Sequence, residues 1–354
     1  MSTGLEASWK DTLAAAGAQF GNWFGREEAL VFGDARGEAL ALAEGVAVAD
    51  CSSRSQLELT GADRAALLHN LSTNQIRKLA SGAGAEAFLL DNKGHTLFYV
   101  TIFAGENAHV VDTMPGDGAR LAAHLDRYVI REKVEIVDRS AEWAELLVAG
   151  PRADELLSGA ATGTVPREQL AHNRVEIDGR KAWLRRVDWL AVPGVVVATA
   201  REHLPHVWSW LVERGAIPCG ARALDAARIE AGTPLYGRDI SSANLPQEVG
   251  RVAQTVSFTK GCYLGQETVA RLDSMGHVNK SLVRLTLAGT QAPEPGSELL
   301  APGQAQGQNA GHVTSAAFSE RLGVAVALAY VRRGSNTPGT VLESTAGPAT
   351  VTGA

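Results

Sequence analysis

The chain has 354 residues, more than one hydrophobic core usually holds, so we expect two or three domains. Its hydrophobic fraction of 45% and charged fraction of 20% are typical of a globular protein and exclude a disordered one. The net charge of -6, with no basic stripe, argues against direct nucleic-acid binding. No stretch approaches the roughly 20 apolar residues of a membrane span, and the polar N-terminus lacks the order of a signal peptide. We therefore expect a cytoplasmic protein without a membrane partner.

The three cysteines, Cys51, Cys219 and Cys262, are too few and too scattered for a disulfide framework. No C-x-x-C motif is present, so the chain lacks a metal-cluster cage of its own. The closest approach to a ligand pair is His203 and His206, but no further ligand follows at metal spacing. We expect no resident metal.

The first part of the chain, to about Phe32, is typical of an amphipathic helix followed by a loop around Trp23 and Gly25. Beyond it, alternating or apolar runs predict strands, and apolar residues at helical spacing predict helices. Asp91-Asn-Lys-Gly94 is a strong hairpin signal, because Asn and Gly tolerate positive φ. In chain order we expect a strand at 56–60, a helix from 61, strands at 87–90, 96–103 and 109–112, a helix at 117–128 and a strand at 134–137.

A similar order of elements then returns. We expect a strand at 146–148, a helix at 153–157, strands at 174–177, 182–187 and 194–198, and a helix at 202–213. Two successive strand–helix–strand–strand–helix units predict two intertwined, ferredoxin-like α+β domains, split near residue 140. The repeat is one of element order, without repetition of residues.

The last third changes character. Residues 221–232 predict a helix that ends at Gly232, and 233–259 form a polar connection of the length usually found in functional loops. After about Ser274, short β-rich runs alternate with a Gly/Pro/Gln-rich segment, as in a small all-β barrel. We therefore expect an α+β region at 1–273 and a C-terminal β-barrel domain at 274–354.

One cysteine stands in a setting that favours reactivity. Cys262 follows Lys260 and Gly261, and in an extended segment Lys260 and Cys262 would share a face. A nearby ammonium favours the thiolate, which is the nucleophilic form of cysteine. The glycine lets the backbone approach a ligand closely. Cys262 and Lys260 are therefore candidate catalytic residues, although most lone cysteines are structural.

The residues after Cys262 complete a dense polar motif. They add a phenol, a second permissive glycine, an amide, a carboxylate and a fixed positive charge, contributed by Tyr263, Gly265, Gln266, Glu267 and Arg271. Cys51 and Cys219 lack such neighbours, and for them we expect a structural role.

The run Lys260-Gly-Cys-Tyr-x-Gly-Gln-Glu267, followed by Arg271, resembles the signature of the YgfZ group of folate-binding proteins. These are relatives of the glycine-cleavage aminomethyltransferase, and they include a mitochondrial iron–sulfur cluster assembly factor. The resemblance extends over nearly the whole chain, through the stretches 48–52, 59–64, 68–74, 228–232, 311–315 and 327–331.

This resemblance implies an aminomethyltransferase-like fold, with two α+β domains and a barrel around a tetrahydrofolate. A folate needs a polar partner for the pterin edge, an apolar slot for its rings and cations for its glutamate tail. By the resemblance, Arg228, Glu230, Arg54 and Tyr99 are the candidate folate-binding residues. From the residues alone, Arg228 could equally form an ion pair on a helix surface.

Two departures from the transferase argue against glycine cleavage. Phe98-Tyr99 stands where the aminomethyltransferase carries an Asp pair, and a phenol with a pKa of about 10 supplies no negative charge at neutral pH. The stretch 190–196 contains no acid where the transferase has glutamates.

The resemblance therefore implies iron–sulfur cluster assembly or repair through Cys262, with tRNA modification affected only through client enzymes. A solitary thiolate could ligate a cluster transiently or exchange sulfur. The partners would then be a folate and iron–sulfur client or assembly proteins. The alternatives are a folate-dependent one-carbon transferase or demethylase, and a folate-sensing module without chemistry.

Overall fold

The computed structural model describes residues 3–301 and 309–353. By its internal contacts the chain forms two compact units. Unit 1 comprises Met1–Arg64, Leu79–Gly84 and Ile102–Leu224, and unit 2 comprises Ala65–Lys78, Ala85–Thr101 and Asp225–Ala354. None of the helices in the described ranges combines the length and apolar character needed to span a membrane.

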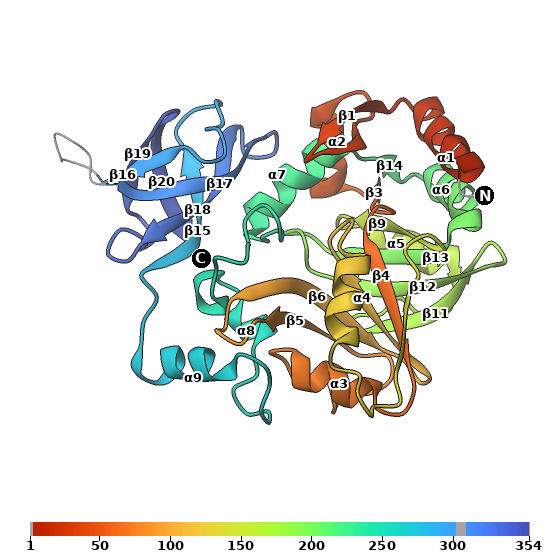
Figure 1. The fold of residues 1–354 in the computed structure, drawn as a ribbon. Coiled ribbons are helices and arrows are strands. Elements are labelled where there is room, and N and C mark those ends of the chain that lie inside the picture. Colours follow the sequence, from red (N-terminus) through yellow and green to blue (C-terminus); the bar gives the residue numbers. More distant parts are fainter. Residues whose placement is uncertain (1–2, 302–308, 354) are drawn as a thin grey trace. The chain divides into compact units, whose positions relative to one another are not determined.

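A large mixed sheet forms the core of unit 1 (Figure 1). Within the described residues its seven strands have the order β10-β11-β12-β13-β9-β3-β14. Its central strands bury Val48, Leu146, Val148, Val195 and Val197 against apolar side chains of the flanking helices. The strands are β3 (Ala47–Asp50), β9 (Trp143–Ala149), β10 (Ala161–Thr162), β11 (His172–Ile177), β12 (Arg180–Val187), β13 (Gly194–Ala200) and β14 (Ile217–Pro218).

A second sheet has the strand order β5-β6-β7-β4-β8 in the described chain. Strand β4 pairs antiparallel with both β7 and β8, so that the N-terminal strand lies inside the sheet. Its strands are β4 (Ser55–Thr60), β5 (Gly84–Leu90), β6 (Thr96–Ala104), β7 (Ala108–Thr113) and β8 (Glu135–Asp138). These positions agree with the predicted strands to within a few residues.

Helices follow the strands in the predicted alternation. They are α1 (Thr3–Ala15), α2 (Ala35–Glu44), α3 (Arg64–Leu71), α4 (Gly118–Asp126), α5 (Ala153–Ala160), η1 (Arg201–His203) and α6 (Leu204–Glu213). The chain thus has the predicted α+β fold.

The loop expected after the first helix is instead a β-hairpin, β1 (Gln19–Trp23) and β2 (Arg26–Val31). Phe24 and Gly25 form its two-residue turn, and both have positive φ, 51° and 81°. Two such residues give the turn whose twist matches paired strands. Phe24 hides this signal, because a bulky side chain rarely takes positive φ.

Unit 2 contains most of α3, β5 and β6, and then the long connection and the barrel (Figure 1). Besides α3, which begins at Arg64 in unit 1, it contains α7 (Ala221–Ala231), which also begins in unit 1, η2 (Pro246–Glu248), α8 (Val252–Thr255) and α9 (Gln266–Met275). Among described residues the barrel is closed, in the order β15-β18-β17-β16-β19-β20. Its strands are β15 (Lys280–Leu287), β16 (Glu298–Leu300), β17 (Asn309–Ser319), β18 (Val324–Arg332), β19 (Val341–Ser344) and β20 (Gly347–Gly353).

Candidate functional site

Cys262 lies in the loop between α8 and α9, and its side chain is exposed. Residues 260–263 belong to no strand, so the alternation of strand side chains does not put Lys260 and Cys262 on one face. The loop instead buries Lys260 and Tyr263, the residues two before and one after the thiol. The motif is therefore a loop that presents one exposed sulfur, and an action of Lys260 on the thiol stays a prediction.

Lys260 caps the C-terminal end of α3. Its Nζ donates hydrogen bonds to the carbonyl oxygens of His69, Ser72 and Asn74, at 2.5, 2.5 and 2.9 Å. The last carbonyls of a helix lack partners within it, so a cation there is favourable. Burial, and then the charge of Arg77, lower the pKa of Lys260 to about 7, whereas three carbonyl acceptors favour the protonated amine. The ammonium thus connects the cysteine loop to a segment 186 to 191 residues earlier in the chain.

Tyr263 and Gly265 determine the path of the chain after the thiol. Tyr263 packs in an apolar cluster with Phe88 and Val269, and burial raises its pKa to about 12. Gly265 has a φ of +80° and precedes the first turn of α9. A Cβ at this position would lie 2.5 Å from the carbonyl oxygen of Asp91. A glycine is therefore required both by the backbone conformation and by the available space.

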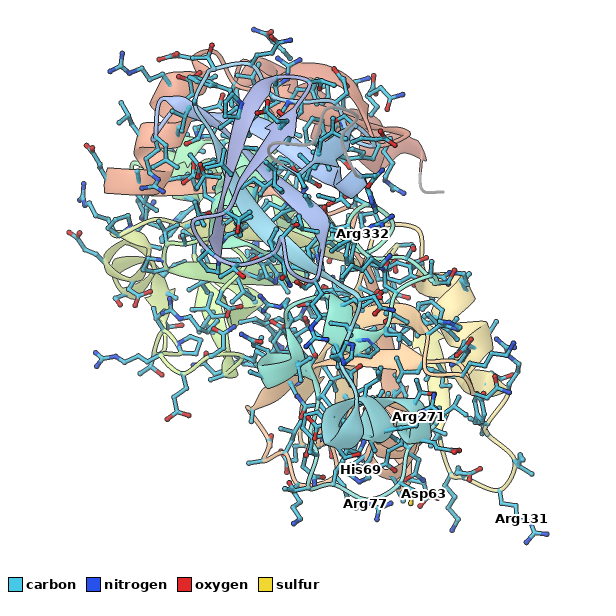
Figure 2. All side chains as sticks on the ribbon, turned by 90° about the vertical axis from the view of Figure 1, so that its left-hand side faces the viewer. Asp63, His69, Arg77, Arg131, Arg271 and Arg332 are labelled. Atoms are coloured by element: carbon cyan, nitrogen blue, oxygen red, sulfur yellow. The ribbon has the colours of Figure 1, made fainter. Side chains whose placement is uncertain are left out.

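The rest of the motif continues into α9. Gln266 and Glu267 form its first turn, and a carboxylate there suits the positive end of a helix dipole. Arg271 is exposed further along the helix, and Figure 2 labels it together with His69 and Arg77, all in unit 2. Gly261 is exposed, and a Cβ added to it would meet no atom within 4 Å. Buried contacts thus fix both sides of the loop, and its centre is accessible.

The loop offers one thiolate and no metal cage. Across the part of the chain that the structure describes, no three His, Cys, Asp or Glu side chains gather as metal ligands do. Cys262 could therefore supply one ligand of a metal or cluster, and the remaining ligands would come from a partner.

Arg228 lies in a buried polar network instead of on the surface. Its Nε donates to Asp225 at 2.8 Å, its Nη1 to Asp239 at 2.5 Å and its Nη2 to Ser315 of β17 at 2.7 Å. Its Nη1 also donates to the carbonyl oxygen of Thr233 at 3.2 Å. This arginine joins α7, the long connection and the barrel, so contact with a folate would compete with four existing hydrogen bonds.

Glu230 and Tyr99, the next two predicted folate residues, also have protein partners. The Glu230 carboxylate pairs with Arg321 at 2.5 Å and accepts a hydrogen bond from Ser319. The Tyr99 hydroxyl donates to Glu86 at 2.5 Å, and the Glu86 carboxylate pairs with Arg251 at 2.9 Å. Folate binding by either residue stays a prediction.

Arg54, the last of the four predicted folate residues, belongs to a group of buried polar side chains in unit 1. We call this group the buried carboxylate cluster, and it consists of Arg54, Gln56, Asp112, Glu145 and Arg185. Arg54 Nε donates to Asp112 at 2.7 Å, and its guanidinium lies 4.5 Å from the ring centre of Trp189. Arg185 Nη1 donates to Glu145 at 2.5 Å and to Gln56 Oε1 at 3.1 Å.

Two acceptors of this cluster remain unused. Asp112 and Glu145 are each 1% exposed, and their Oδ2 and Oε2 atoms have no hydrogen-bond partner in the described chain. Burial, and then the charge of Asp112, raise the pKa of Glu145 to about 8. Unpaired buried oxygens are costly, and they mark a place where a ligand's N–H groups could bind. The N–H edge of a pterin fits this donor requirement, and the Arg54–Trp189 pair offers a flat surface for its rings.

Sequence reasoning found Arg54 in this cluster and missed the other members. They come from β4, β7, β9 and β12, and none lies in a motif. Charged residues within otherwise apolar strands, such as Glu145 in Trp143–Ala149, are the one signal that could have indicated them.

Comparison with known proteins shows the family of the chain. Residues 9–260 match the family model of the GCVT N-terminal domain, and residues 280–352 match that of the glycine cleavage T-protein C-terminal barrel domain. An aminomethyltransferase of Symbiobacterium thermophilum is 30% identical over 347 residues, covering 94% of this chain and 89% of that protein. One from Rubrobacter xylanophilus is 29% identical over 320 residues, covering 90% and 84%.

The fold has a solved counterpart. The crystal structure of glycine cleavage system aminomethyltransferase T from Bartonella henselae superposes with a TM-score of 0.83, covering 97% of this chain and 95% of that one. At 20% sequence identity this likeness concerns the fold alone.

Proposed function

Because the chain belongs to the glycine cleavage T-protein family, we propose that it binds tetrahydrofolate. The Asp112 Oδ2 and Glu145 Oε2 atoms support this proposal, since neither accepts a hydrogen bond in the described chain and the nearest cation, Arg54 Nε, lies 3.7 Å from Glu145 Oε2. In this proposal the two carboxyl groups accept hydrogen bonds from the pterin edge, and Trp189 stacks beside it.

The test is a calorimetric titration of the purified protein with tetrahydrofolate. Asp112→Asn keeps an oxygen for Arg54 and turns an acceptor into a donor, so we expect affinity to fall about tenfold. Asp117→Asn, a change in an exposed ion pair with Arg120, is the matched control. Absence of binding to the wild type contradicts a folate role, and unchanged affinity in Asp112→Asn contradicts this site.

For the activity we propose folate-dependent one-carbon transfer, which is supported by similarity to two aminomethyltransferases over at least 90% of the chain. A bound tetrahydrofolate supplies the nitrogen atoms that carry a one-carbon unit. The residues at 98–99 and 190–196 lack the carboxylates expected of glycine cleavage, so the proposed donor is a different aminomethyl compound.

In an assay with an aminomethyl thioether, the carbon passes to the folate, ammonia leaves and a thiol remains, with no net oxidation. Release of ammonia that requires both protein and tetrahydrofolate supports transfer. Absence of release with a panel of such donors, despite folate binding, counts against it.

A second candidate is carried by the exposure of Cys262. Only this member of the Lys260–Tyr263 segment combines a reactive side chain with exposure, as expected of a group that reaches a partner protein. In this proposal Cys262 supports iron–sulfur cluster assembly or repair by transient thiolate ligation or sulfur exchange. The clients would be iron–sulfur enzymes, including those that modify tRNA.

The test compares iron–sulfur enzyme activities in cells that carry either the wild-type chain or Cys262→Ala. A fall in those activities with Cys262→Ala, and none with Cys219→Ala, supports the second candidate. Undiminished activity in Cys262→Ala rejects it and leaves one-carbon transfer as the proposal.

A further inference from the structure

Unit 1 contains a cavity of about 960 Å³, and its lining includes Gln56 and Arg185 of the buried carboxylate cluster. It lies between β4 and β7 on one side and β11 and β12 on the other, and all its lining residues belong to unit 1. Its volume lies within the range of small-molecule sites, which are mostly apolar with a few well-placed polar groups. The Cys262 loop contributes no lining residue.

Two buried polar side chains among the lining residues carry free N–H groups. Gln56 is 2% exposed and Arg185 is 3% exposed, and they are joined through Arg185 Nη1 and Gln56 Oε1. In the described chain, all hydrogen bonds of the Arg185 guanidinium run from Nη1, and the Gln56 amide nitrogen has no protein acceptor. These groups are donors without acceptors, which is the arrangement that binds a carboxylate.

The charge around Arg185 also favours an anion. Its partner Glu145 has a pKa raised to about 8, by burial first and Asp112 second, which weakens the negative charge that faces Arg185. Arg54 pairs with Asp112 and also lies 3.7 Å from Glu145 Oε2, so the two arginines share the Glu145 carboxyl. Arg185 therefore lacks a full counter-charge, and a buried cation without one is costly. An anion in the cavity would supply it.

The side chains that line the cavity near Arg185 include aromatic rings. The rings of Phe103 and Trp183 each lie with their centres 5.4 Å from that of His172, and Arg185 stacks 4.8 Å from the centre of Phe103. Burial lowers the pKa of His172 to about 4, so this ring is neutral. Aromatic rings beside the Arg185 guanidinium suit a planar ligand ring that carries a negative group.

We propose that this cavity binds a small aromatic carboxylate, whose carboxylate group is held by Arg185 and Gln56 and whose ring lies against Phe103 and Trp183. Arg174, which stacks 4.7 Å from the ring centre of Trp183, stands exposed at the rim. This site adjoins the proposed folate site through the Arg185–Glu145 pair, but its ligand differs, because its free donors attract anions whereas Asp112 and Glu145 are acceptors.

The test uses benzoate as the probe and its neutral amide, benzamide, as the chemical control, with ligand-observed NMR at pH 7. We expect benzoate to bind the wild type at least about tenfold more tightly than benzamide, because only benzoate forms charge-assisted hydrogen bonds. Binding should persist with tetrahydrofolate present at saturation. Equal affinity for both probes, or loss of benzoate binding when folate is added, overturns the proposal.

Gln56→Glu is the decisive variant. The new carboxylate keeps an acceptor for Arg185 Nη1 and supplies the missing anion from the protein, so benzoate binding should fall about tenfold while the fold is retained. Arg185→Gln is the second variant, with the same expected loss. Arg174→Gln, at the exposed rim, should change benzoate affinity less than threefold. Unchanged benzoate binding in folded Gln56→Glu overturns the proposal.

Discussion

The Cys262 loop in unit 2 and the buried carboxylate cluster in unit 1 use charged side chains in opposite ways. In the loop, the three N–H groups of Lys260 all donate to carbonyl oxygens, and the reactive sulfur of Cys262 is exposed. In the cluster, arginines and carboxylates are paired in the interior, and two oxygens remain without partners. The buried polar groups of the loop are hydrogen-bonded, and the loop exposes a thiol. The cluster keeps two acceptors without hydrogen bonds, which suits it to bind a ligand.

The difference shows where stability and chemistry can be separated. Buried polar groups that are fully hydrogen-bonded stabilise a local conformation. Those without partners raise the free energy of the folded state, and a ligand that binds them can remove this penalty. Substitutions should therefore affect stability most in the cluster and in the support of the loop, and least at the exposed thiol.

The largest effect is expected from Arg185→Met. It removes the nearer of the two cations that face buried Glu145 and leaves only Arg54 at 3.7 Å, and breaking such a buried pair costs about 4 kcal/mol of unfolding free energy. Urea unfolding of the purified protein measures this change. Arg152→Met, which breaks an exposed pair with Glu155, is the control and should cost less than about 0.5 kcal/mol. Equal effects in the two variants would contradict a buried cluster.

Lys260→Met should cost about 3 kcal/mol, because three buried or partly buried carbonyl oxygens lose their donor. Thermal and urea unfolding give the value. Lys93→Met, at an exposed hairpin position, is the matched control, with an expected change below about 0.5 kcal/mol. If Lys260→Met left stability unchanged but altered thiol reactivity, Lys260 would act on Cys262 and not as a cap.

Gly265→Ala should cost about 2 kcal/mol, because alanine at a φ of +80° is strained and its Cβ meets the carbonyl oxygen of Asp91. The same substitution at Gly261 meets no atom within 4 Å and should change stability by less than about 0.5 kcal/mol. Comparison of the two melting curves separates the support of the loop from its exposed centre. A similar loss in both variants would refute this division.

The pH dependence of stability reports on Glu145, whose folded-state pKa of about 8 lies above its ordinary value of 4.5. Between these values the folded protein holds a proton that the unfolded chain has lost, so stability falls as pH rises through this window. The slope is at most about 1.4 kcal/mol per pH unit. Glu145→Gln should flatten this fall in urea unfolding from pH 5 to pH 9. A fall as steep as in the wild type would show that another group is responsible.

Cys262→Ala should have the smallest effect on stability, less than about 0.5 kcal/mol, because the side chain is exposed. Its thiol should react with a maleimide in the native protein, whereas the buried Cys219 should react only after unfolding. Slow labelling of native Cys262, at the rate of Cys219, would contradict the exposed loop.

Much of the fold could be predicted from the sequence, since β4 to β9 and the barrel follow local patterns of alternation and turn residues. The motif around Cys262 was also visible, because its members are contiguous. The role of Lys260 was not, since its three acceptors lie 186 to 191 residues earlier and only folding brings them close. The buried carboxylate cluster escaped for the same reason, as its members come from separate strands. The boundary proposed at residues 273 and 274 stays a prediction.

The network around Arg228 bears on whether the barrel is a removable module. Ser315 of β17 accepts a hydrogen bond from Arg228 and donates one to Asp239 at 2.5 Å. A barrel strand therefore supplies one of the hydrogen-bond partners of the buried Arg228 guanidinium on α7. A chain cut before residue 274 would keep this arginine but lose one of its partners and the cover that keeps water away. The barrel therefore covers the buried Arg228 charge. We expect the barrel and the α+β region to be inherited and expressed together and to unfold together.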